Sequence, residues 1–282
     1  MSDFVFAAFA DEAGAALSEQ IDAMLENRVP LLEIRGVDGK NVTALTVEEA
    51  KEVRKRLDDA GLAVWSMGSP IGKIGIRDAF GPHLDLFRHT LDLAEILGAK
   101  AFRLFSFYSP AGEDPELYRD EVLERMERFT EAGKGSGILL CHENEKGIYG
   151  DVADRCRAIH ENLPGVGAVF DPANYIQTGE NTLEAWEKVE KYVKYMHIKD
   201  ALSSGGVVPP GRGEGHVEEI AKQYMAQGGT RFTIEPHLWN AAVIKTLENG
   251  EQTSVLGEKY IYRNSDEAFD AAVQSFRALI GA

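Results

Sequence analysis

The sequence predicts an α/β fold, namely a single (β/α)8 TIM barrel, on the basis of two observations. Short apolar runs alternate with charged segments of helical period, and this alternation repeats eight times in 282 residues, once in about 35 residues. The turn after the first apolar run, AFADEAG, lacks the glycine pattern with which a doubly wound sheet usually begins. We therefore expect one barrel domain over residues 1–282, without a linker or a second domain.

The eight apolar runs are short, which is typical of the buried parallel strands of a barrel. The expected strands are residues 4–10, 31–35, 63–67, 101–107, 138–143, 167–171, 195–198 and 231–235.

Helix signals fill the intervals between these runs. Ser18 is expected to cap the first helix, Thr46 and Glu49 form a capping box for the second, and Gly61 and Gly98 follow two helix ends. The expected helices are residues 18–27, 46–60, 83–98, 115–132, 151–162, 182–191, 216–227 and 266–279.

Two connections differ from the rest. Residues 203–215, SSGGVVPPGRGEG, follow the seventh strand, and their glycines are expected to give this loop freedom to close over a site. Residues 238–265 follow the eighth strand and are too long for a simple connector, so a short hairpin or a lid is expected there.

Composition and charge exclude several classes of protein. Thirty Lys and Arg against 46 Asp and Glu give a net charge of −16, which repels phosphate backbones, and no basic patch offsets it. The apolar runs are too short to span a membrane. Two cysteines without a CxxC pair and an N-terminus without a signal peptide indicate a reducing compartment. We expect a cytoplasmic protein that binds neither nucleic acid nor membranes.

Four consecutive strands are each expected to end at a potential metal ligand, namely Glu143, Asp171, His197 and Glu235. Catalytic residues of a barrel lie at the carboxyl ends of its strands, so the four side chains can converge on one point. Three carboxylates and one imidazole suit a hard or borderline divalent cation such as Mn²⁺, Mg²⁺, Co²⁺ or Zn²⁺. Acidic residues also end strands simply because loops begin there, but four in succession favour one metal site.

Seven short motifs, taken in order, resemble the sugar phosphate isomerase/epimerase superfamily, whose members have a xylose isomerase-like barrel. The motifs are FADEAG, LEIR, GSPIGK, HENE, DPAN, HIKD and IEPH, and they cover nearly the whole chain. The superfamily includes ketose 3-epimerases, hydroxypyruvate isomerase and inosose dehydratase. The resemblance implies a small sugar substrate, one divalent metal with Mn²⁺ preferred, and a homodimer or homotetramer.

The same resemblance assigns roles to individual residues. It makes Glu143, Asp171, His197 and Glu235 the metal ligands, and it makes Glu143 and Glu235 the acid/base pair as well. A divalent cation stabilises an enediolate, so that the two glutamates can remove and return a proton on opposite faces of the sugar. His197 is then expected to bind the metal as neutral imidazole, with its other nitrogen held by an acceptor outside the ligand set.

The sequence also departs from its relatives. Asn174 stands where several of them carry histidine. DNA-repair relatives use a histidine-rich site for three zinc ions, whereas this chain has seven histidines, of which His83, His89 and His160 fall in expected helices. We therefore expect one metal and no nucleic-acid substrate.

Five further side chains are candidate substrate contacts: Arg212, Lys199, Glu33, Lys73 and His237. Arg212 matches an arginine that contacts substrate oxygens in some epimerase relatives, although a solvated loop arginine is the alternative. Lys199 shares the inward face of His197 and can bind a hydroxyl or pair with a carboxylate. Glu33 and Arg35 share a face and can either form an internal ion pair or bind the sugar.

The leading hypothesis is a metal-dependent isomerase or epimerase of a keto-sugar or a related polyol-ketone. One alternative keeps the metal but eliminates a hydroxyl, as an inosose-type dehydratase does. Another is a metal-free lyase that forms a Schiff base on Lys199 or Lys73, and the last is a non-catalytic sugar-binding barrel. The sequence leaves open whether the substrate is phosphorylated.

Overall fold

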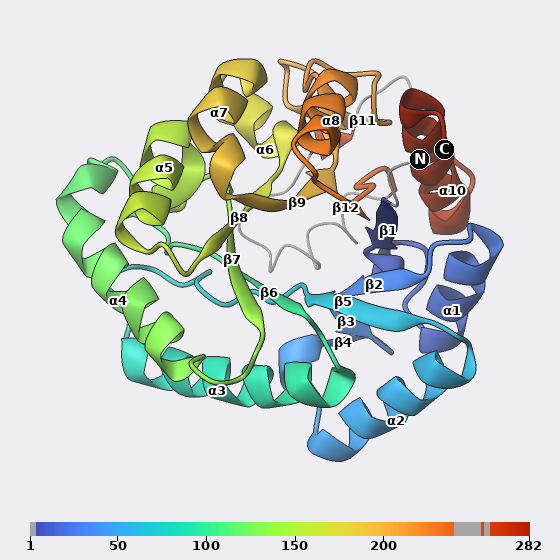
Figure 1. The fold of residues 1–282 in the computed structure, drawn as a ribbon, viewed down its shortest axis with the longest axis horizontal. Helices are drawn as coiled ribbons and strands as arrows, with labels where there is room; N and C mark the ends of the chain where they lie inside the picture. Colours follow the sequence, from blue (N-terminus) through green and yellow to red (C-terminus); the bar gives the residue numbers. More distant parts are fainter. Residues whose placement is uncertain (1–3, 240–254, 257–259) are drawn as a thin grey trace.

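Eight parallel strands close into a barrel in the computed structural model, which describes residues 4–239, 255–256 and 260–282 (Figure 1). Around the barrel the strands follow the order β1, β12, β9, β8, β7, β6, β5, β2. The fold is therefore the predicted (β/α)8 barrel. The barrel strands are β1 (Val5–Ala8), β2 (Leu31–Ile34), β5 (Ala63–Met67), β6 (Ala101–Leu104), β7 (Leu139–Glu143), β8 (Gly167–Phe170), β9 (Val193–Ile198) and β12 (Arg231–Ile234).

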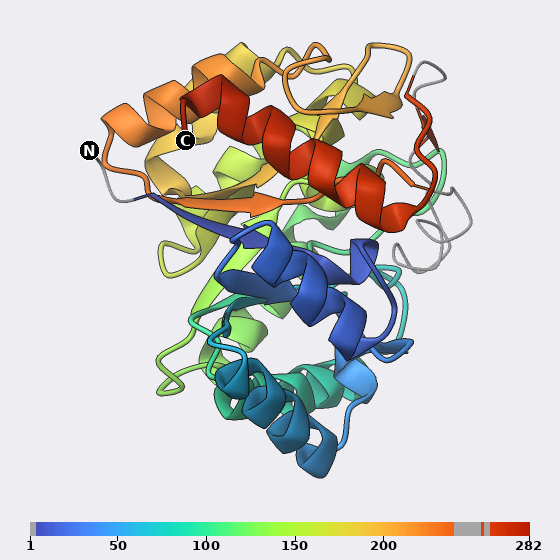
Figure 2. The same cartoon turned by 90° about the vertical axis from the view of Figure 1, so that its right-hand side faces the viewer.

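Helices surround the barrel, and the last of them, α10, runs beside α1 and α8 (Figure 2). The short helix α6 was not expected from the sequence. The helices are α1 (Leu17–Glu26), α2 (Val47–Asp59), α3 (Phe80–Leu97), α4 (Arg119–Ala132), α5 (Ala153–Asn162), α6 (Pro172–Gln177), α7 (Thr182–Val189), α8 (Val217–Ala226) and α10 (Ser265–Ile280).

Three of the four capping predictions are confirmed, including Gly61, which follows the end of α2 with φ of 73°. In the capping box of α2, the Glu49 amide donates to Oγ1 of Thr46 and the Thr46 amide donates to Oε2 of Glu49. Gly98 ends α3 in the left-handed conformation, with φ of 75°. The serine cap of α1 is wrong: the helix begins one residue earlier, and the Leu17 amide donates to Oδ1 of Asp38 at 2.8 Å, so the cap comes from a distant loop.

The strand expected over 101–107 ends at Leu104. Beyond it the chain pairs with the loop after β5, since the amide of Phe105 donates to the carbonyl of Ile71 and that of Phe107 to the carbonyl of Gly72. Gly72 has φ of 93°, and a Cβ atom there would lie 2.0 Å from the Phe105 oxygen. Two loops at the carboxyl end of the barrel are thereby tied together.

A small apolar layer forms the floor of the barrel beneath its carboxyl end. It consists of Ala101, Cys141, Val169 and Tyr195, against which Trp65 packs. Because side chains alternate along a strand, the residues two positions further on point into the same interior, one level higher. This alternation determines which side chains can form a polar site at the carboxyl end of the barrel, which is called the mouth below.

The loops after β9 and β12 meet in a small sheet made of β10 (Asp200–Ala201), β11 (Gly206–Val208) and β13 (Val255–Leu256). The expected hairpin or lid in 238–265 lies mostly outside the described residues. After β2, strands β3 (Gly36–Val37) and β4 (Lys40–Asn41) form a separate antiparallel pair. Across the described part of the chain, no helix is long and apolar enough to cross a membrane.

Candidate metal centre

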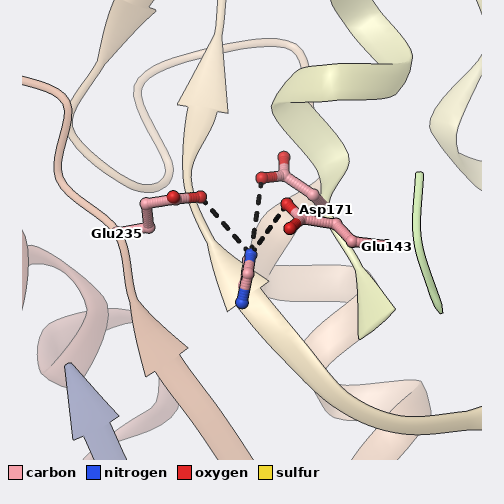
Figure 3. A group of neighbouring side chains, drawn as sticks. Glu143, Asp171 and Glu235 are labelled. Atoms are coloured by element: carbon pink, nitrogen blue, oxygen red, sulfur yellow. Dashed lines mark hydrogen bonds and ion pairs between the residues drawn. The ribbon is translucent and has the colours of Figure 1, made fainter. Parts of the chain in front are cut away.

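Glu143, Asp171, His197 and Glu235 converge at the carboxyl ends of β7, β8, β9 and β12. Each is buried and offers one ligand atom, and the four atoms lie within 4.8 Å of one another. Nδ1 of His197 lies 2.9 Å from Oε1 of Glu143, 3.4 Å from Oε2 of Glu235 and 3.9 Å from Oδ2 of Asp171. Figure 3 shows Glu235 approaching from one side and the other two carboxylates from the opposite side.

Local structure fixes Asp171 in this position. One carboxylate oxygen, Oδ1, caps α6 by accepting from the Asn174 amide at 3.0 Å, which leaves Oδ2 directed toward the cluster. Asn144, which follows β7, binds both backbone groups of Asp171 with its side-chain amide, each at 2.9 Å. The Asn174 side chain donates to Oε1 of Glu143 at 3.3 Å, so the two acidic strand ends are held together.

The second nitrogen of His197 meets the acceptor that was expected, and this acceptor is Glu33 on β2. Nε2 of His197 lies 3.1 Å from Oε2 of Glu33, whose other oxygen accepts hydrogen bonds from Tyr195 and Ser66. This arrangement orients the imidazole and presents Nδ1 to the three carboxylates. Of the two alternatives for Glu33 and Arg35, the internal ion pair is wrong, because Glu33 binds His197 and Arg35 binds Asp11, Glu12 and Glu235 instead.

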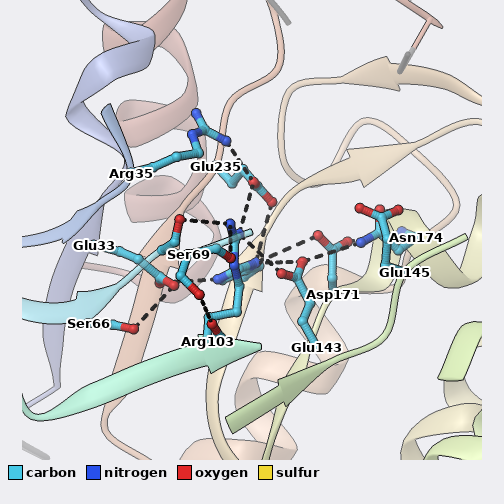
Figure 4. A network of polar contacts seen from close by, with 12 residues as sticks. Glu33, Arg35, Ser66, Ser69, Arg103, Glu143, Glu145, Asp171, Asn174 and Glu235 are labelled. Atoms are coloured by element: carbon cyan, nitrogen blue, oxygen red, sulfur yellow. Dashed lines mark hydrogen bonds and ion pairs between the residues drawn. The ribbon is translucent and has the colours of Figure 1, made fainter. Parts of the chain in front are cut away.

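Two arginines flank the cluster, and Arg103 was not anticipated. Arg35 donates to Asp11, to Glu12 and, through Nη1 at 3.3 Å, to Oε1 of Glu235. Arg103, on β6, places Nη1 3.1 Å from Oε2 of Glu143 (Figure 4). Arg103 lies two positions after the floor residue Ala101, so the register that selects Glu143 and His197 also selects it.

Two lysines at the mouth are paired with carboxylates. Nζ of Lys199 lies 2.9 Å from Oδ2 of Asp171 and 3.0 Å from Oε2 of Glu235. Lys73 pairs with Glu145 at 2.9 Å and covers the Phe105 ring. Burial alone favours the neutral amine of Lys199, but the charges of Asp171, Glu235 and neighbouring carboxylates outweigh it and raise its pKa well above the ordinary value.

The predicted substrate contacts Arg212 and His237 occupy different environments. Arg212 is exposed and has no ion-pair partner among the described residues. His237 is buried, its backbone amide donates to Oε2 of Glu12 at 2.5 Å, and its Nε2 lies 3.5 Å from Oε1 of Glu235. The structure therefore places His237 beside the cluster and leaves Arg212 in the loop.

The glycine-rich loop that carries Arg212 is fixed by an internal carboxylate, contrary to the expected freedom. Asp200 accepts hydrogen bonds from the amides of Gly211, Gly213 and Gly215 at 2.8 to 2.9 Å. A Cβ atom on Gly213 would lie 2.3 Å from Oδ1 of Asp200. Glycine is therefore required where the loop backbone passes close to the Asp200 carboxylate, and the glycine amides are already occupied by that carboxylate.

Buried charges shift several pKa values at the mouth. Burial raises the pKa of Glu12 to about 8, against the opposing influence of Arg35. Burial alone would lower the pKa of His197, but Glu143, Glu33 and Glu235 raise it well above its ordinary value. The cluster therefore stabilises positive charge at the position of Nδ1.

The donor set fits a divalent cation. Three carboxylates and a neutral imidazole are the ligand types that Mn²⁺, Mg²⁺, Co²⁺ and Zn²⁺ accept. The chain would hold the cation with Glu143, Asp171, His197 and Glu235, which all lie within reach of one ion. His83, His89 and His160 lie in helices, and His160 is occupied with the carbonyl of Val166.

Fold and site together define a (β/α)8 barrel with a candidate divalent-cation site at the carboxyl ends of its strands. The chain belongs to the xylose isomerase-like TIM barrel family, whose model matches residues 31–247. The resemblance inferred from the seven motifs is thereby confirmed. No curated protein matches the sequence at a significant level.

Solved structures share this fold over nearly the whole chain. The IolI protein with a bound zinc atom has a TM-score of 0.75 at 13% identity, covering 98% of both chains. AsbF from Bacillus anthracis, a probable 3-DHS dehydratase, has a TM-score of 0.72 at 12% identity, covering 97% of this chain and 98% of its own. YcjR from E. coli, a 3-keto-D-glucoside 4-epimerase, has a TM-score of 0.68 at 15% identity, covering 99% of both chains. At these identities the likeness shows the fold alone.

Proposed function

We propose that the protein is a divalent-metal-dependent isomerase or epimerase of a keto-sugar or a related polyol-ketone. The observation that carries the proposal is the convergence of two glutamates, one aspartate and one histidine, buried and within reach of one ion. The zinc-bound IolI structure and the epimerase YcjR share the fold, which supports both the metal and the class of reaction. The ion we favour is Mn²⁺.

Glu143 and Glu235 are the proposed acid/base pair. A bound divalent cation supplies a Lewis acid that stabilises the enediolate formed when a proton leaves the carbon beside the carbonyl. Glu143 and Glu235 lie on opposite sides of the cluster, which supports a transfer between two faces of a sugar (Figure 3). General acid/base help of this kind is worth roughly 10²–10⁴-fold in rate.

The lysines at the mouth favour a substrate without phosphate. Lys199 and Lys73 are each paired with buried carboxylates, so neither offers an unbalanced charge to a phosphate group. The glycine amides near Arg212, which otherwise resemble a phosphate cradle, already bind Asp200. Lys199, Lys73, Glu33 and His237 are proposed to contact or shape the sugar, and Arg212 to reach it from the loop.

A dehydratase is the second candidate, because AsbF, a probable 3-DHS dehydratase, has the same fold. The same carboxylates can remove a proton from the carbon beside a carbonyl and give a proton to a hydroxyl on the neighbouring carbon, which leaves as water. The Schiff-base lyase is disfavoured, since Lys199 is held as an ammonium ion by Asp171 and Glu235 and is therefore a poor nucleophile.

We further propose that residues 1–282 form one domain and that the protein resides in the cytoplasm. Both cysteines, Cys141 and Cys156, are free and buried, which agrees with a reducing compartment.

The test is proton NMR in D₂O with Mg²⁺-loaded protein and a panel of the free D-2-ketohexoses and scyllo-inosose. We expect loss of one proton signal beside a carbonyl, as solvent deuterium enters that carbon. Glu143→Gln should abolish this exchange. Glu180→Gln, which changes a half-buried glutamate that caps α5 by accepting from the Ala153 amide, should leave it intact.

The outcomes separate the candidates. Exchange with the carbon skeleton and all hydroxyls retained identifies an isomerase or epimerase, whereas loss of a hydroxyl with a new ultraviolet absorption identifies a dehydratase. Activity that survives EDTA would contradict both metal-dependent reactions. Exchange that persists in Glu143→Gln would contradict the assigned acid/base role.

A further inference from the structure

The two carboxylate oxygens of Glu143 have different neighbours, and the same is true of Glu235. Oε1 of Glu143 and Oε2 of Glu235 face Nδ1 of His197, at 2.9 and 3.4 Å, and so lie on the side of the proposed cation. The other two, Oε2 of Glu143 and Oε1 of Glu235, are named here the cation-distal oxygens. Both face Nη1 of Arg103, at 3.1 and 3.9 Å.

Arg103 is itself firmly held. Its Nη2 donates to the carbonyl of Gly68 at 3.1 Å. Its guanidinium carbon lies 5.1 Å from the centre of the Phe9 ring and 5.0 Å from that of the Phe105 ring. Only 6% of the residue is exposed. A planar cation fixed by two rings and a carbonyl has little freedom to follow a moving carboxylate.

Carboxylates bind divalent cations through either one or both oxygens. A glutamate that gives both oxygens to the cation has none left to accept a proton from a substrate. An arginine bound to one oxygen prevents this, since its guanidinium remains charged throughout the reaction and holds that oxygen away from the cation. Arg103 is placed to do so for Glu143 (Figure 4).

We propose that Arg103 is a positioning residue that holds the cation-distal oxygen of Glu143, so that this glutamate binds the cation with one oxygen and keeps the other for proton transfer. The inference rests on the proposed function and adds a residue to it. Arg35 has the same relation to Oε1 of Glu235, at 3.3 Å, but also binds Asp11 and Glu12. The two carboxylates that Arg103 faces are both proposed metal ligands, so Arg103 gives the clearer test.

The test compares Mn²⁺ bound to the wild-type protein with Mn²⁺ bound to Arg103→Met, by electron paramagnetic resonance. The zero-field splitting of Mn²⁺ reports the symmetry of its ligands and needs no substrate. We expect this splitting to change in Arg103→Met, while Mn²⁺ binds no more weakly than in wild type, because a nearby positive charge has been removed. In Arg103→Lys, which keeps the charge but not the planar fork, the change should be smaller.

Arg231→Met is the matched control. Arg231 lies at the opposite end of the barrel, over the Trp65 ring, and is only half-buried, so its loss should leave the splitting unchanged. If Arg103→Met does not fold, Arg103→Lys decides the comparison. An unchanged splitting in every folded Arg103 variant would overturn the proposal.

Solvent deuterium exchange supplies the second measurement. With a ketose that the wild-type protein exchanges, Arg103→Met should lose about 100-fold in rate, the usual cost of a catalytic group misplaced by about 1 Å. If the wild type exchanges none of the panel but the splitting changes as expected, the isomerase proposal fails and the role of Arg103 stands. If the wild type binds no Mn²⁺, both proposals fail.

Discussion

From the hydrogen bond between Glu33 and His197 we predict that a change at Glu33 lowers the affinity of the protein for its metal ion. Oε2 of Glu33 lies 3.1 Å from Nε2 of His197, and both side chains are fully buried. The carboxylate determines which imidazole nitrogen carries the proton, and so presents Nδ1 to the cation as a ligand. Glu33→Gln removes the charge while preserving the size of the side chain.

The amide of Glu33→Gln can still accept from His197, and its NH₂ group can donate to Tyr195 and Ser66, which now bind Oε1 of Glu33. The variant should therefore still fold, and the change should lower its affinity for the metal ion. Changes to partners that orient a metal-binding histidine typically cost 10–100-fold in affinity, or about 1.4–2.7 kcal/mol. We expect a loss of Mn²⁺ affinity in this range.

Isothermal titration of the metal-free protein with Mn²⁺ at pH 7 measures the effect directly. Glu180→Gln is the matched control, since it makes the same change at a half-buried glutamate outside the cluster. Circular dichroism and thermal unfolding confirm that both variants are folded. A folded Glu33→Gln protein that binds Mn²⁺ as tightly as the wild type would refute the assigned role of Glu33.

Three further predictions concern the scaffold. Burial lowers the pKa of His160 to about 4 from 6.5, so its contribution to stability is full above pH 6.5 and falls as the pH drops toward 4. Urea unfolding should show that the change in stability between pH 7 and 5 is ~2 kcal/mol less unfavourable in His160→Phe than in the wild type; an equal change in both would contradict the assignment. Asp200→Asn deprives the Gly211 and Gly213 amides of an acceptor and should lower the free energy of unfolding by about 2 kcal/mol. Hydrogen exchange at both amides should become faster, and unchanged exchange would show that the carboxylate does not hold the loop. Gly72→Ala should cost about 3 kcal/mol or more in thermal unfolding, because its Cβ would overlap the Phe105 oxygen, whereas Gly39→Ala, with φ of 76° but open space, should cost about 1 kcal/mol.

The fold and the candidate ligand set could be predicted from the sequence because both depend on the spacing of apolar residues along the chain and on the order of the strands. Glu143 and His197 follow Cys141 and Tyr195 by two positions, and strand alternation carries that relation into space. Asp171 could be identified because it directly follows an apolar run, although α6, which it caps, was missed as too short to show a period.

Arg103 was missed for a different reason. The candidate ligands are acidic and histidine side chains at the ends of strands, whereas Arg103 lies within an apolar run, AFRLF, where an arginine is readily attributed to the outer face. The same two-residue relation, from Ala101 to Arg103, would have found it. An inward arginine in a barrel strand must be paired, and so indicates a carboxylate opposite it.

The partners of Glu33 and Asp200 could not be predicted, because each contact joins segments far apart in the chain. Glu33 meets His197 across 164 positions, because closure of the barrel leaves only β1 and β12 between β2 and β9. Asp200 meets the glycine amides only when its loop folds back on β10. Local patterns identify the residue types, whereas the three-dimensional path of the chain determines the pairs.

The charges at the mouth limit the kind of substrate. At pH 7 six charged carboxylates stand against four cations, since burial raises the pKa of the seventh carboxyl group, Glu12, to about 8; the balance is −2 when His197 is neutral, and one divalent cation brings it to zero. A phosphate dianion would then find no unbalanced positive charge among these groups, whereas an uncharged polyol can donate hydrogen bonds from its hydroxyl groups to the same carboxylates. The seven carboxyl groups are Asp11, Glu12, Glu33, Glu143, Glu145, Asp171 and Glu235, and the cations are Arg35, Arg103, Lys73 and Lys199. Since these cations already pair with the carboxylates, the mouth favours recognition of a neutral sugar through its hydroxyl groups.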